Sequence, residues 1–335
     1  MLRVAVDALG GDHAPESVVG GCLLALEKDS ELQIALCGPA ERLKTLLSGK
    51  AYDSARLKII EAPDFISNHD SPTLAIRRKL NSSMVVAMDL LKKGEAEAFI
   101  SAGSTGAILA GGVFRVGRIK GIERPAIGAI LPTLEGTPVM LIDSGANADA
   151  KPEYLSQFAL MGSSYMRGVL GVKGPRVGLL NVGAESEKGN ELTKSAFPLL
   201  EGAPIDFYGN IEARDALSGE VQVIVADGFS GNIFLKSVEG TVSLLFTLLK
   251  GAMNEGVLAK LGGALVYPKL KAMKKRLDYE EYGGAALLGV NGVMIKAHGS
   301  SSASAFSQAI LQGASCARAG VVRAIEEQLH LALQG

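Results

Sequence analysis

The chain has 335 residues, of which 47% are hydrophobic, and its 34 basic against 35 acidic side chains give a formal net charge of −1. A chain of this length can bury a large core, and the near-neutral charge argues against a nucleic-acid-binding protein, which would show a basic excess. The three cysteines, Cys22, Cys37 and Cys316, lie far apart without a CxxC pair, so neither a disulfide framework nor structural zinc is expected. These features predict a reduced cytosolic protein that binds no nucleic acid.

Short apolar runs alternate along the chain with longer runs of helical character. The strand candidates are 3–7, 32–37, 58–60, 98–101, 126–131, 139–143, 176–181, 205–208, 221–226 and 292–296. The helix candidates are 15–28, 40–47, 84–93, 105–116, 152–168, 191–200, 232–253 and 303–333. Most strand candidates are apolar throughout, as expected for strands covered on both faces. The alternation predicts a three-layer α/β/α fold with a mostly parallel sheet, in a single catalytic domain that spans residues 1–335.

Neither a signal peptide nor a membrane span is expected. The first strand candidate follows Met1 almost directly, which leaves no room for a leader. The longest apolar stretch, 238–249, contains Glu239 and is shorter than the roughly 18–20 residues that a span needs.

Glycine-rich polar motifs follow many of the strand candidates. They are 7–12, 101–106, 143–147, 181–189 and 227–232, together with residues of 282–302 ahead of the last helix. Glycine lets the backbone approach a ligand closely, and open α/β sheets bind ligands where their strands end. Each motif alone is typical of a tight turn, but their recurrence at successive strand ends indicates one shared polar pocket. No motif has the spacing of a nucleotide-binding fingerprint.

Two of these motifs precede predicted helices. Ser101–Gly106 and His298–Ser302 place small residues and hydroxyls at helix N-termini, where free N–H groups and the helix dipole favour an anion. Simple N-capping by serine or threonine remains an alternative, above all for Ser301.

Eight motifs, in order along essentially the whole chain, together resemble the phosphate acyltransferases of bacterial phospholipid synthesis. They are 6–15 (VDALGGDHAP), 71–79 with 82–84, 101–107 (SAGSTGA), 143–147 (DSGAN), 180–189 (LNVGAESEKG), 208–215 (YGNIEARD), 227–232 (DGFSGN) and 278–301. The departures are few: Ser104 stands where this family usually has Asn, Leu9 where it often has Met, and Ala286 where Pro is common.

The resemblance implies a fold similar to that of phosphotransacetylases and isocitrate dehydrogenases. It implies a cytosolic homodimer that associates peripherally with the membrane, and it implies no cofactor and no metal. The implied reaction is the reversible transfer of a fatty acyl group from acyl carrier protein to inorganic phosphate. The acyl phosphate would then pass to a membrane glycerol-phosphate acyltransferase for phosphatidic acid synthesis.

The chemistry of this reaction suits a site rich in Gly, Ser and Asn. Phosphate is largely dianionic near neutral pH, because phosphate esters lose their second proton near pH ~6, and the leaving thiol has a pKa of about 8.5. Neither a strong base nor a strong acid is therefore needed. The site must position the anion, stabilise the tetrahedral oxyanion and exclude water.

On this basis we predict the following roles. The predicted catalytic residues are His298, Lys188, Asn232 and Asp227. The predicted substrate- and phosphate-binding residues are Gly10, Gly11, Asp12, Ser101, Gly103, Ser104, Thr105, Asp143, Asn147, Asn181, Glu185, Asn291 and Ser301. Lys188 is the candidate counter-charge to phosphate, although a solvated loop lysine is an equal alternative, and His298 is a candidate donor to the oxyanion or the leaving sulfur. The acidic residues are expected to orient donors and loops.

Two surfaces are predicted to dock partners. Because acyl carrier protein is acidic, its docking site should be basic. The candidates are the clusters Arg77, Arg78 and Lys79, and Arg115, Arg118, Lys120 and Arg124. A protruding helical tip at 253–276 is expected to touch an anionic membrane surface, with a break at Gly262–Gly263 and a second limb after Pro268. Its predicted contact residues are Leu258, Leu261, Leu265, Val266, Lys271, Lys274 and Lys275.

Two other functions stay open at this point. A metal- and nicotinamide-dependent decarboxylating dehydrogenase of the same broad fold would use acidic residues 143, 185 and 227 as cation ligands. The chain shows no clustered Asp pair and no arginine set for a tricarboxylate. The other alternative is a lipid- or acyl-carrier-binding module without catalysis.

Overall fold

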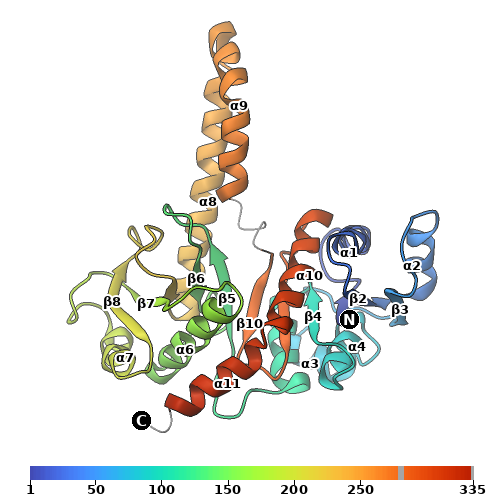
Figure 1. Ribbon diagram of the computed structural model, residues 1–335, viewed down its shortest axis with the longest axis horizontal. Coiled ribbons are helices and arrows are strands. Elements are labelled where there is room, and N and C mark those ends of the chain that lie inside the picture. Colours follow the sequence, from blue (N-terminus) through green and yellow to red (C-terminus); the bar gives the residue numbers. More distant parts are fainter. Residues whose placement is uncertain (278–282, 333–335) are drawn as a thin grey trace.

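The computed structural model describes residues 1–277 and 283–332, without the side chains of residues 275 and 276 (Figure 1). The strands are β1 (Leu2–Asp7), β2 (Leu32–Gly38), β3 (Leu57–Glu61), β4 (Ala98–Ser101), β5 (Ala126–Leu131), β6 (Val139–Ile142), β7 (Arg176–Asn181), β8 (Asp206–Glu212), β9 (Val223–Val225), β10 (Ala285–Leu288) and β11 (Val293–Lys296). The helices are α1 (Glu16–Lys28), α2 (Ala40–Leu47), α3 (Pro72–Arg78), α4 (Ser83–Lys92), α5 (Thr105–Gly111) with a π-helical turn at Gly112–Val116, α6 (Pro152–Gly168), α7 (Glu191–Glu201), α8 (Gly228–Met253), α9 (Gly256–Leu277), α10 (Ala303–Arg318) and α11 (Val321–Ala332).

In the described part of the chain the strands form one sheet in the order β3-β2-β1-β4-β11-β10-β5-β6-β9-β7-β8. Neighbours pair in parallel except at β11–β10, β10–β5 and β5–β6. The strands β1 to β4 and β11 therefore run one way, whereas β6 to β9 run the other. The prediction of a mostly parallel α/β sheet is confirmed.

Helices cover both faces of the sheet because side chains alternate between faces along each strand. In β1, Val4 and Val6 belong to the largest apolar cluster, which α1, α2, α6, α7, α10 and α11 cover, whereas Ala5 faces the cluster under α3 to α5. A third cluster, around Leu141 and Phe234, lies between β6 and α8. The second and third clusters lie on the same face of the sheet, and the cavity described below lies on that face.

The structure also differs from the sequence expectations for several individual elements. The expected 303–333 helix is two helices, because Gly320 adopts φ 61° between α10 and α11, and position 333 lies outside the described residues. Strand β10 and helix α3 were not expected. The expected break at Gly262–Gly263 and the separate limb after Pro268 are wrong, because α9 runs through all three residues as one helix.

The glycine pair does not break α9 because Gly263 faces the neighbouring helix. A Cβ on Gly263 would lie 3.0 Å from Met253 Cβ, so the missing side chain lets α9 pack closely against α8. Pro268 removes one backbone hydrogen bond, at an exposed position where water can bind the freed carbonyl.

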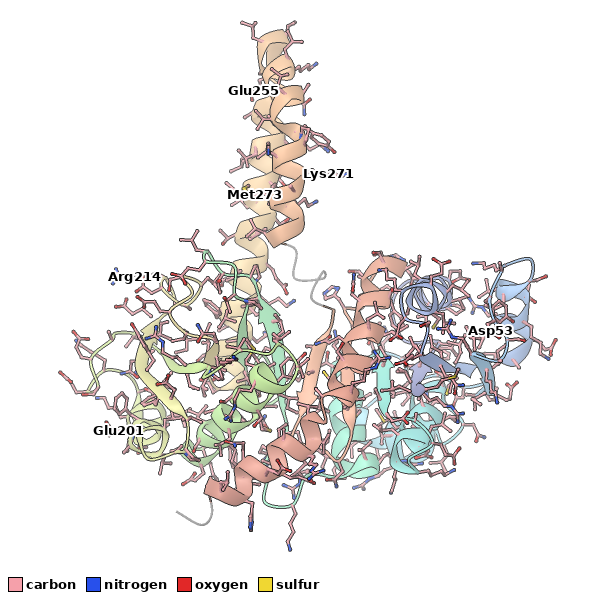
Figure 2. The ribbon with its side chains drawn as sticks, viewed as in Figure 1. Asp53, Glu201, Arg214, Glu255, Lys271 and Met273 are labelled. Carbon is pink, nitrogen blue, oxygen red and sulfur yellow. The ribbon has the colours of Figure 1, made fainter. Side chains whose placement is uncertain are left out.

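Helices α8 and α9 form a hairpin that projects from the body (Figure 1). Glu255 lies near its far end, and Lys271 and Met273 lie along α9 (Figure 2). By length and composition α8 is also apolar enough to cross a membrane, with mean hydropathy 1.3 over its most apolar window. The apolar stretch 238–249 was expected to be too short for a membrane span. That expectation is wrong as to length, because the stretch belongs to a helix of 26 residues. The first turns of α8 line a cavity in the body, so only its outer part projects.

Candidate functional site

A cavity of about 440 Å³ lies over β5, between α5 and the start of α8. On this face the cavity separates the two smaller apolar clusters, to which Ile127 and Leu131 of β5 belong. Its polar lining comes from several segments that follow strands or begin helices. The polar lining side chains are Thr105, Ser144, Asn232, Lys236, Glu239, Lys296 and His298.

The loops after β1 and β4 are joined by a buried carboxylate. Asp7 accepts hydrogen bonds from Ser83 Oγ at 2.5 Å and from Ser101 Oγ at 2.6 Å. Burial raises the pKa of Asp7, and these hydrogen bonds lower it by less. Ser101 Oγ in turn accepts from the Gly103 N–H. The Ser101 hydroxyl is thus fully used in structural hydrogen bonds. Together, Asp7, Ser83 and Ser101 fix the backbone beside the cavity.

Gly10 and Gly11 stand where the backbone of the first loop meets its neighbours. A Cβ on Gly10 would lie 2.6 Å from Asp7 Oδ2 and 2.7 Å from the Gly103 nitrogen, so only glycine fits there. Gly11 has φ 108°, a conformation that glycine favours. The Asp12 N–H donates to the Gly299 carbonyl at 2.7 Å, which ties this loop to the one after β11.

Asp143 organises the loop after β6. This fully buried carboxylate accepts hydrogen bonds from the backbone N–H groups of Ile127, Gly145, Ala146 and Asn147. Asn147 Nδ2 also donates to it, at 2.9 Å, and to the Pro125 carbonyl. Asp143 and Asn147 therefore hold the loop in place, and Ser144 and Gly145 of that loop line the cavity.

The start of α8 contributes an amide and two charged side chains. Asp227 caps the helix by accepting from the N–H groups of Phe229 and Ser230 at 3.0 and 2.9 Å. One turn later Asn232 lines the cavity. Beyond it, Lys236 Nζ and Glu239 Oε2 form an ion pair at 2.7 Å. Asp227 thus positions α8 and leaves the contacts with a ligand to later residues.

The end of β11 brings Lys296 and His298 to the cavity. His298 Nδ1 accepts from the Ser300 N–H at 3.3 Å and lies 2.8 Å from Ser300 Oγ, which assigns the ring proton to Nε2. Burial lowers the pKa of His298, and the nearby charges of Lys296 and Lys236 lower it further. His298 is accordingly neutral near pH 7. Ser301 is buried behind it, and Ser302 caps α10.

Other predicted residues lie apart from the cavity lining. Lys188 and Glu185 are exposed in the loop after β7, where Asn181 Nδ2 donates to the Lys188 carbonyl. Asn291 lies in the turn between β10 and β11, at the opposite end of β11 from Lys296. Its side chain donates to the Arg118 carbonyl. Ser104 precedes α5, and its neighbour Thr105 lines the cavity.

Sequence reasoning missed Lys236, Glu239, Lys296 and Gln312. The first three line the cavity. Gln312 Oε1 accepts from the Gly284 N–H at 2.6 Å, and its Nε2 donates to the Tyr165 hydroxyl, so it fixes the start of β10. A lysine that ends an apolar strand was a signal that could have identified Lys296.

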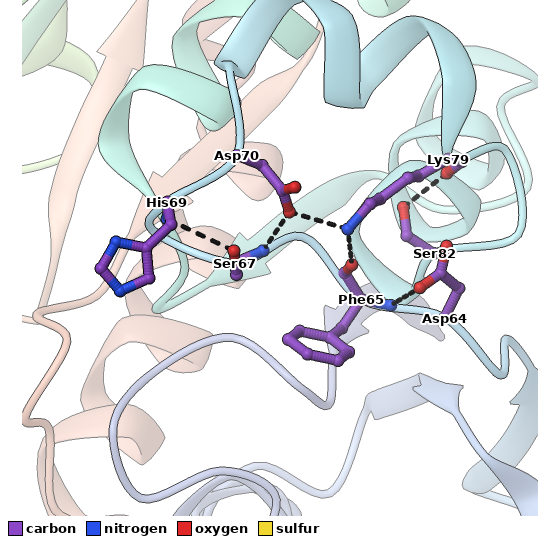
Figure 3. Close-up of polar contacts among 7 residues, drawn as sticks. All are labelled: Asp64, Phe65, Ser67, His69, Asp70, Lys79 and Ser82. Atoms are coloured by element: carbon purple, nitrogen blue, oxygen red, sulfur yellow. Dashed lines mark hydrogen bonds and ion pairs between the residues drawn. The ribbon is translucent and has the colours of Figure 1, made fainter.

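Both basic clusters contain residues that are already paired. Lys79 Nζ contacts Asp70 at 2.7 Å and the Phe65 carbonyl at 3.0 Å (Figure 3). Arg115 binds Asp89 through two hydrogen bonds. The guanidinium of Arg77, in contrast, stacks 4.9 Å from the ring centre of the exposed Phe114, next to Arg115.

Four basic side chains of these clusters complete the surface. Arg78, Lys120 and Arg124 are exposed, and Arg118 donates to the Glu123 carbonyl. The stacking of Arg77 on Phe114 brings the two predicted clusters into contact.

The hairpin exposes apolar side chains along both helices. Leu258 is 86% exposed and Leu265 83%. Leu261 and Val266 are also exposed, as are Lys271 and Lys274, whereas the side chain of Lys275 lies outside the described part. The described residues group no three His, Cys, Asp or Glu side chains that could hold a metal ion.

The sequence and the fold have counterparts among known proteins. A family model described as fatty acid synthesis protein matches residues 2–324. A phosphate acyltransferase of Clostridium acetobutylicum is 47% identical over 98% of this chain and 99% of its own length. Those of Clostridium botulinum and Geobacillus thermodenitrificans are 50% and 48% identical, each over 98% of this chain and over 98% and 99% of their own lengths.

Solved structures show the same fold at low identity. A phosphotransacetylase from Streptococcus pyogenes superposes with a TM-score of 0.63 at 15% identity, covering 95% of this chain and 94% of its own. A branched-chain phosphotransacylase from Enterococcus faecalis gives 0.56 at 13% identity, covering 95% and 99%. With the near-full-length relatives, these findings confirm the resemblance read from the motifs: the chain is an enzyme that belongs to the phosphate acyltransferase family.

Proposed function

We propose that this enzyme transfers a fatty acyl group from acyl carrier protein to inorganic phosphate, reversibly, and so supplies acyl phosphate for phosphatidic acid synthesis. The observation that carries the proposal is the composition of the cavity. Two lysines, a neutral histidine, an asparagine and a threonine line it, and Glu239, the one carboxylate among its described lining residues, is paired with Lys236. Such a lining can bind the attacking phosphate and stabilise the oxyanion that forms on the thioester carbonyl, and it provides no strong base.

No serine or cysteine of the described residues is an activated nucleophile in the cavity, which supports direct attack by phosphate. The three cysteines are buried, and burial raises the pKa of each thiol, to about 12 for Cys316. Ser144 lines the cavity but donates its hydroxyl to the Ile127 carbonyl at 3.0 Å. Neither Ser144 nor a cysteine is therefore a candidate for a covalent acyl-enzyme.

The proposed step balances without a cofactor. An oxygen of hydrogen phosphate forms a bond to the thioester carbon, the carbon–sulfur bond breaks, and the phosphate proton ends on the sulfur. His298 suits the donor role because its Nε2–H is available while Nδ1 is held by Ser300. Asn232, on the α8 side of the same cavity, is a neutral donor for the oxyanion.

We also propose where the enzyme lies in the cell and how it assembles. The exposed apolar side chains and lysines of the hairpin support peripheral binding of a cytosolic enzyme to an anionic membrane, beside a glycerol-phosphate acyltransferase that would consume the product. Exposed leucines on the outer half of α8, at 244, 245 and 248, support association of two copies into a homodimer.

The test is an assay with acyl carrier protein charged with a fatty acyl group. We expect phosphate-dependent release of the free thiol, together with acyl phosphate that hydroxylamine traps as a hydroxamate. His298→Ala should lower turnover and leave the far-ultraviolet circular dichroism spectrum unchanged.

Each alternative function has its own outcome in this assay. Reduction of an added nicotinamide cofactor would replace the proposal with a dehydrogenase, and binding of the acyl carrier without turnover would replace it with a binding module. Equal rates with acyl coenzyme A would remove the carrier protein from the proposal but retain acyl transfer to phosphate.

A further inference from the structure

Two lysines from distant parts of the chain face the same cavity. Lys236 lies on α8, and Lys296 is the last residue of β11. Glu239 binds Lys236 at 2.7 Å. Within residues 1–277 and 283–332, no hydrogen bond or ion pair engages the Lys296 ammonium. Among the lining residues that the structure describes, two ammonium groups therefore face one carboxylate.

The surroundings of Lys296 make a lone ammonium unfavourable. Burial lowers the pKa of Lys296 and the charge of Lys236 lowers it further, while Glu239 and Asp12 raise it by less. An ammonium that loses water without gaining a partner is unfavourable, and an anion bound beside Lys296 removes that cost. The arrangement suits an anionic ligand.

The long helices that begin near the cavity do not compete for this anion. The side chain of Asp227 already accepts from the N–H groups of Phe229 and Ser230 at the start of α8. At the start of α10, Ser302 Oγ accepts from the Ala305 N–H. Because both helices are capped by their own side chains, the lysines are the main cationic groups on the cavity wall.

We infer that Lys236 and Lys296 together bind the phosphate dianion, with His298 beside them where the acyl group is transferred. This inference rests on the proposed function and gives it a definite anion site. It moves the phosphate counter-charge away from Lys188, whose loop follows β7 and does not line the cavity. Lys296 ends its strand beside Ser101, its β4 partner in the sheet, so the rigid sheet fixes its backbone.

The experiment measures binding of inorganic phosphate to the full-length chain without an acyl donor, by calorimetry, and the KM for phosphate in the acyl-transfer assay. Lys296→Gln and Lys236→Gln should each weaken phosphate binding by about tenfold or more, since each removes a charge-assisted hydrogen bond. Lys296→Arg should restore part of the loss. The KM for the acyl donor should stay the same.

Two further lysine variants complete the design. Lys173→Gln, at an exposed position in the turn before β7, is the matched control and should bind phosphate like the wild type. Lys188→Gln tests the earlier assignment. Lys236 is half-exposed on α8, so its variant reports on the site even if Lys296→Gln fails to fold.

The outcomes separate this inference from the proposed function. Wild-type affinity for phosphate in both Lys236→Gln and Lys296→Gln overturns the site, and so does a large loss confined to Lys188→Gln. If these variants form acyl phosphate with an unchanged KM for phosphate, the site fails while the function stands. If the wild type binds phosphate through both lysines but never forms acyl phosphate, the function fails while the anion site stands.

Discussion

At the scale of single residues, Gly10 is the position where the site tolerates least change. A methyl group there would meet Asp7 Oδ2, Ser101 Oγ and the Gly103 nitrogen, all within 2.7 Å. We expect Gly10→Ala to break the buried hydrogen bonds and to lower the free energy of unfolding by about 1–3 kcal/mol, with loss of activity. Chemical denaturation measures the change.

The control for that variant is Gly251→Ala on α8, where a Cβ would meet nothing within 4 Å. It should raise the free energy of unfolding by about 0.5–1 kcal/mol, because alanine favours a helix more than glycine does. Equal effects of the two substitutions would contradict the role assigned to Gly10.

His298 gives the site a pH dependence of known sign. Its pKa lies below the usual histidine value, through burial first and then through the charges of Lys296 and Lys236. The unfolded chain therefore takes up this proton before the folded one does. The stability from neutral His298 is present above the unfolded pKa and is lost as the pH falls through that value toward the folded pKa.

Activity should follow the same titration, because protonation of Nδ1 removes the acceptor for the Ser300 N–H. We expect turnover to fall only at a pH below the ordinary histidine pKa of about 6.5. Lys296→Gln should move the pKa of His298 upward, since it removes a neighbouring positive charge. Titration of the ring by nuclear magnetic resonance, with the signal assigned from its loss in His298→Gln, measures the pKa of His298 in the wild type and in Lys296→Gln. A lower pKa in Lys296→Gln than in the wild type would contradict the placement of Lys296.

Some of the residues predicted from the sequence line the candidate cavity and others do not, for a physical reason. Thr105, Asn232 and His298 were predicted from glycine-rich motifs and line the cavity. Lys188 sits in an equally suggestive motif, yet its loop lies outside the cavity lining. Motifs show where a chain turns, whereas the direction of a side chain such as Lys236 depends on helix position and packing.

At the scale of elements, the adjacent glycines of α9 offer a matched pair. A Cβ on Gly263 would touch Met253, whereas one on Gly262 meets nothing within 4 Å. Gly262→Ala should stabilise the hairpin, and Gly263→Ala should stabilise it less or destabilise it, because both gain the same helix propensity. Amide hydrogen exchange in α9 measures the difference, and faster exchange in Gly262→Ala than in Gly263→Ala would contradict this packing.

The elements that the sequence predicted well are those with a strong local signal. Proline at or just before the first turn of α1, α2 and α6, at 15, 39 and 152, located their starts. The continuity of α9 through Gly263 and the pairing of β10 could not be predicted, since both depend on contacts with other elements. In α9 that contact is with Met253, and in β10 it is with β5 and β11.

The structure narrows the predicted docking surface for the acidic carrier. Lys79 and Arg115 are held by Asp70 and Asp89, so Arg77 and Arg78 are the better candidates. Arg77→Glu combined with Arg78→Glu should raise the KM for acylated carrier protein by about tenfold and reduce its salt dependence, with the KM for phosphate unchanged. Lys173→Glu is the matched control. Unchanged kinetics in the double variant would exclude this surface.

At the scale of the whole molecule, the hairpin reaches away from the body while the cavity lies near its base. The 22 residues of α9 extend about 33 Å at 1.5 Å per residue. The most exposed apolar side chains, Leu258 and Leu265, lie on its outer half. In the proposed membrane-bound state, the hairpin contacts the bilayer while the cavity stays in water, on the side of the membrane where a water-labile product would be used.

The membrane proposal predicts how hairpin variants partition with vesicles. Wild-type protein should sediment with vesicles of anionic lipid and be released by salt, because Lys260, exposed between Leu258 and Leu261, contributes roughly 1 kcal/mol near such a surface. Leu258→Glu and Val266→Glu should abolish sedimentation and keep activity toward soluble substrate. Leu199→Glu, at an exposed leucine of α7, should sediment like the wild type. Release only by detergent would indicate that α8 spans the bilayer, and wild-type sedimentation of both hairpin variants would exclude the hairpin as the membrane contact.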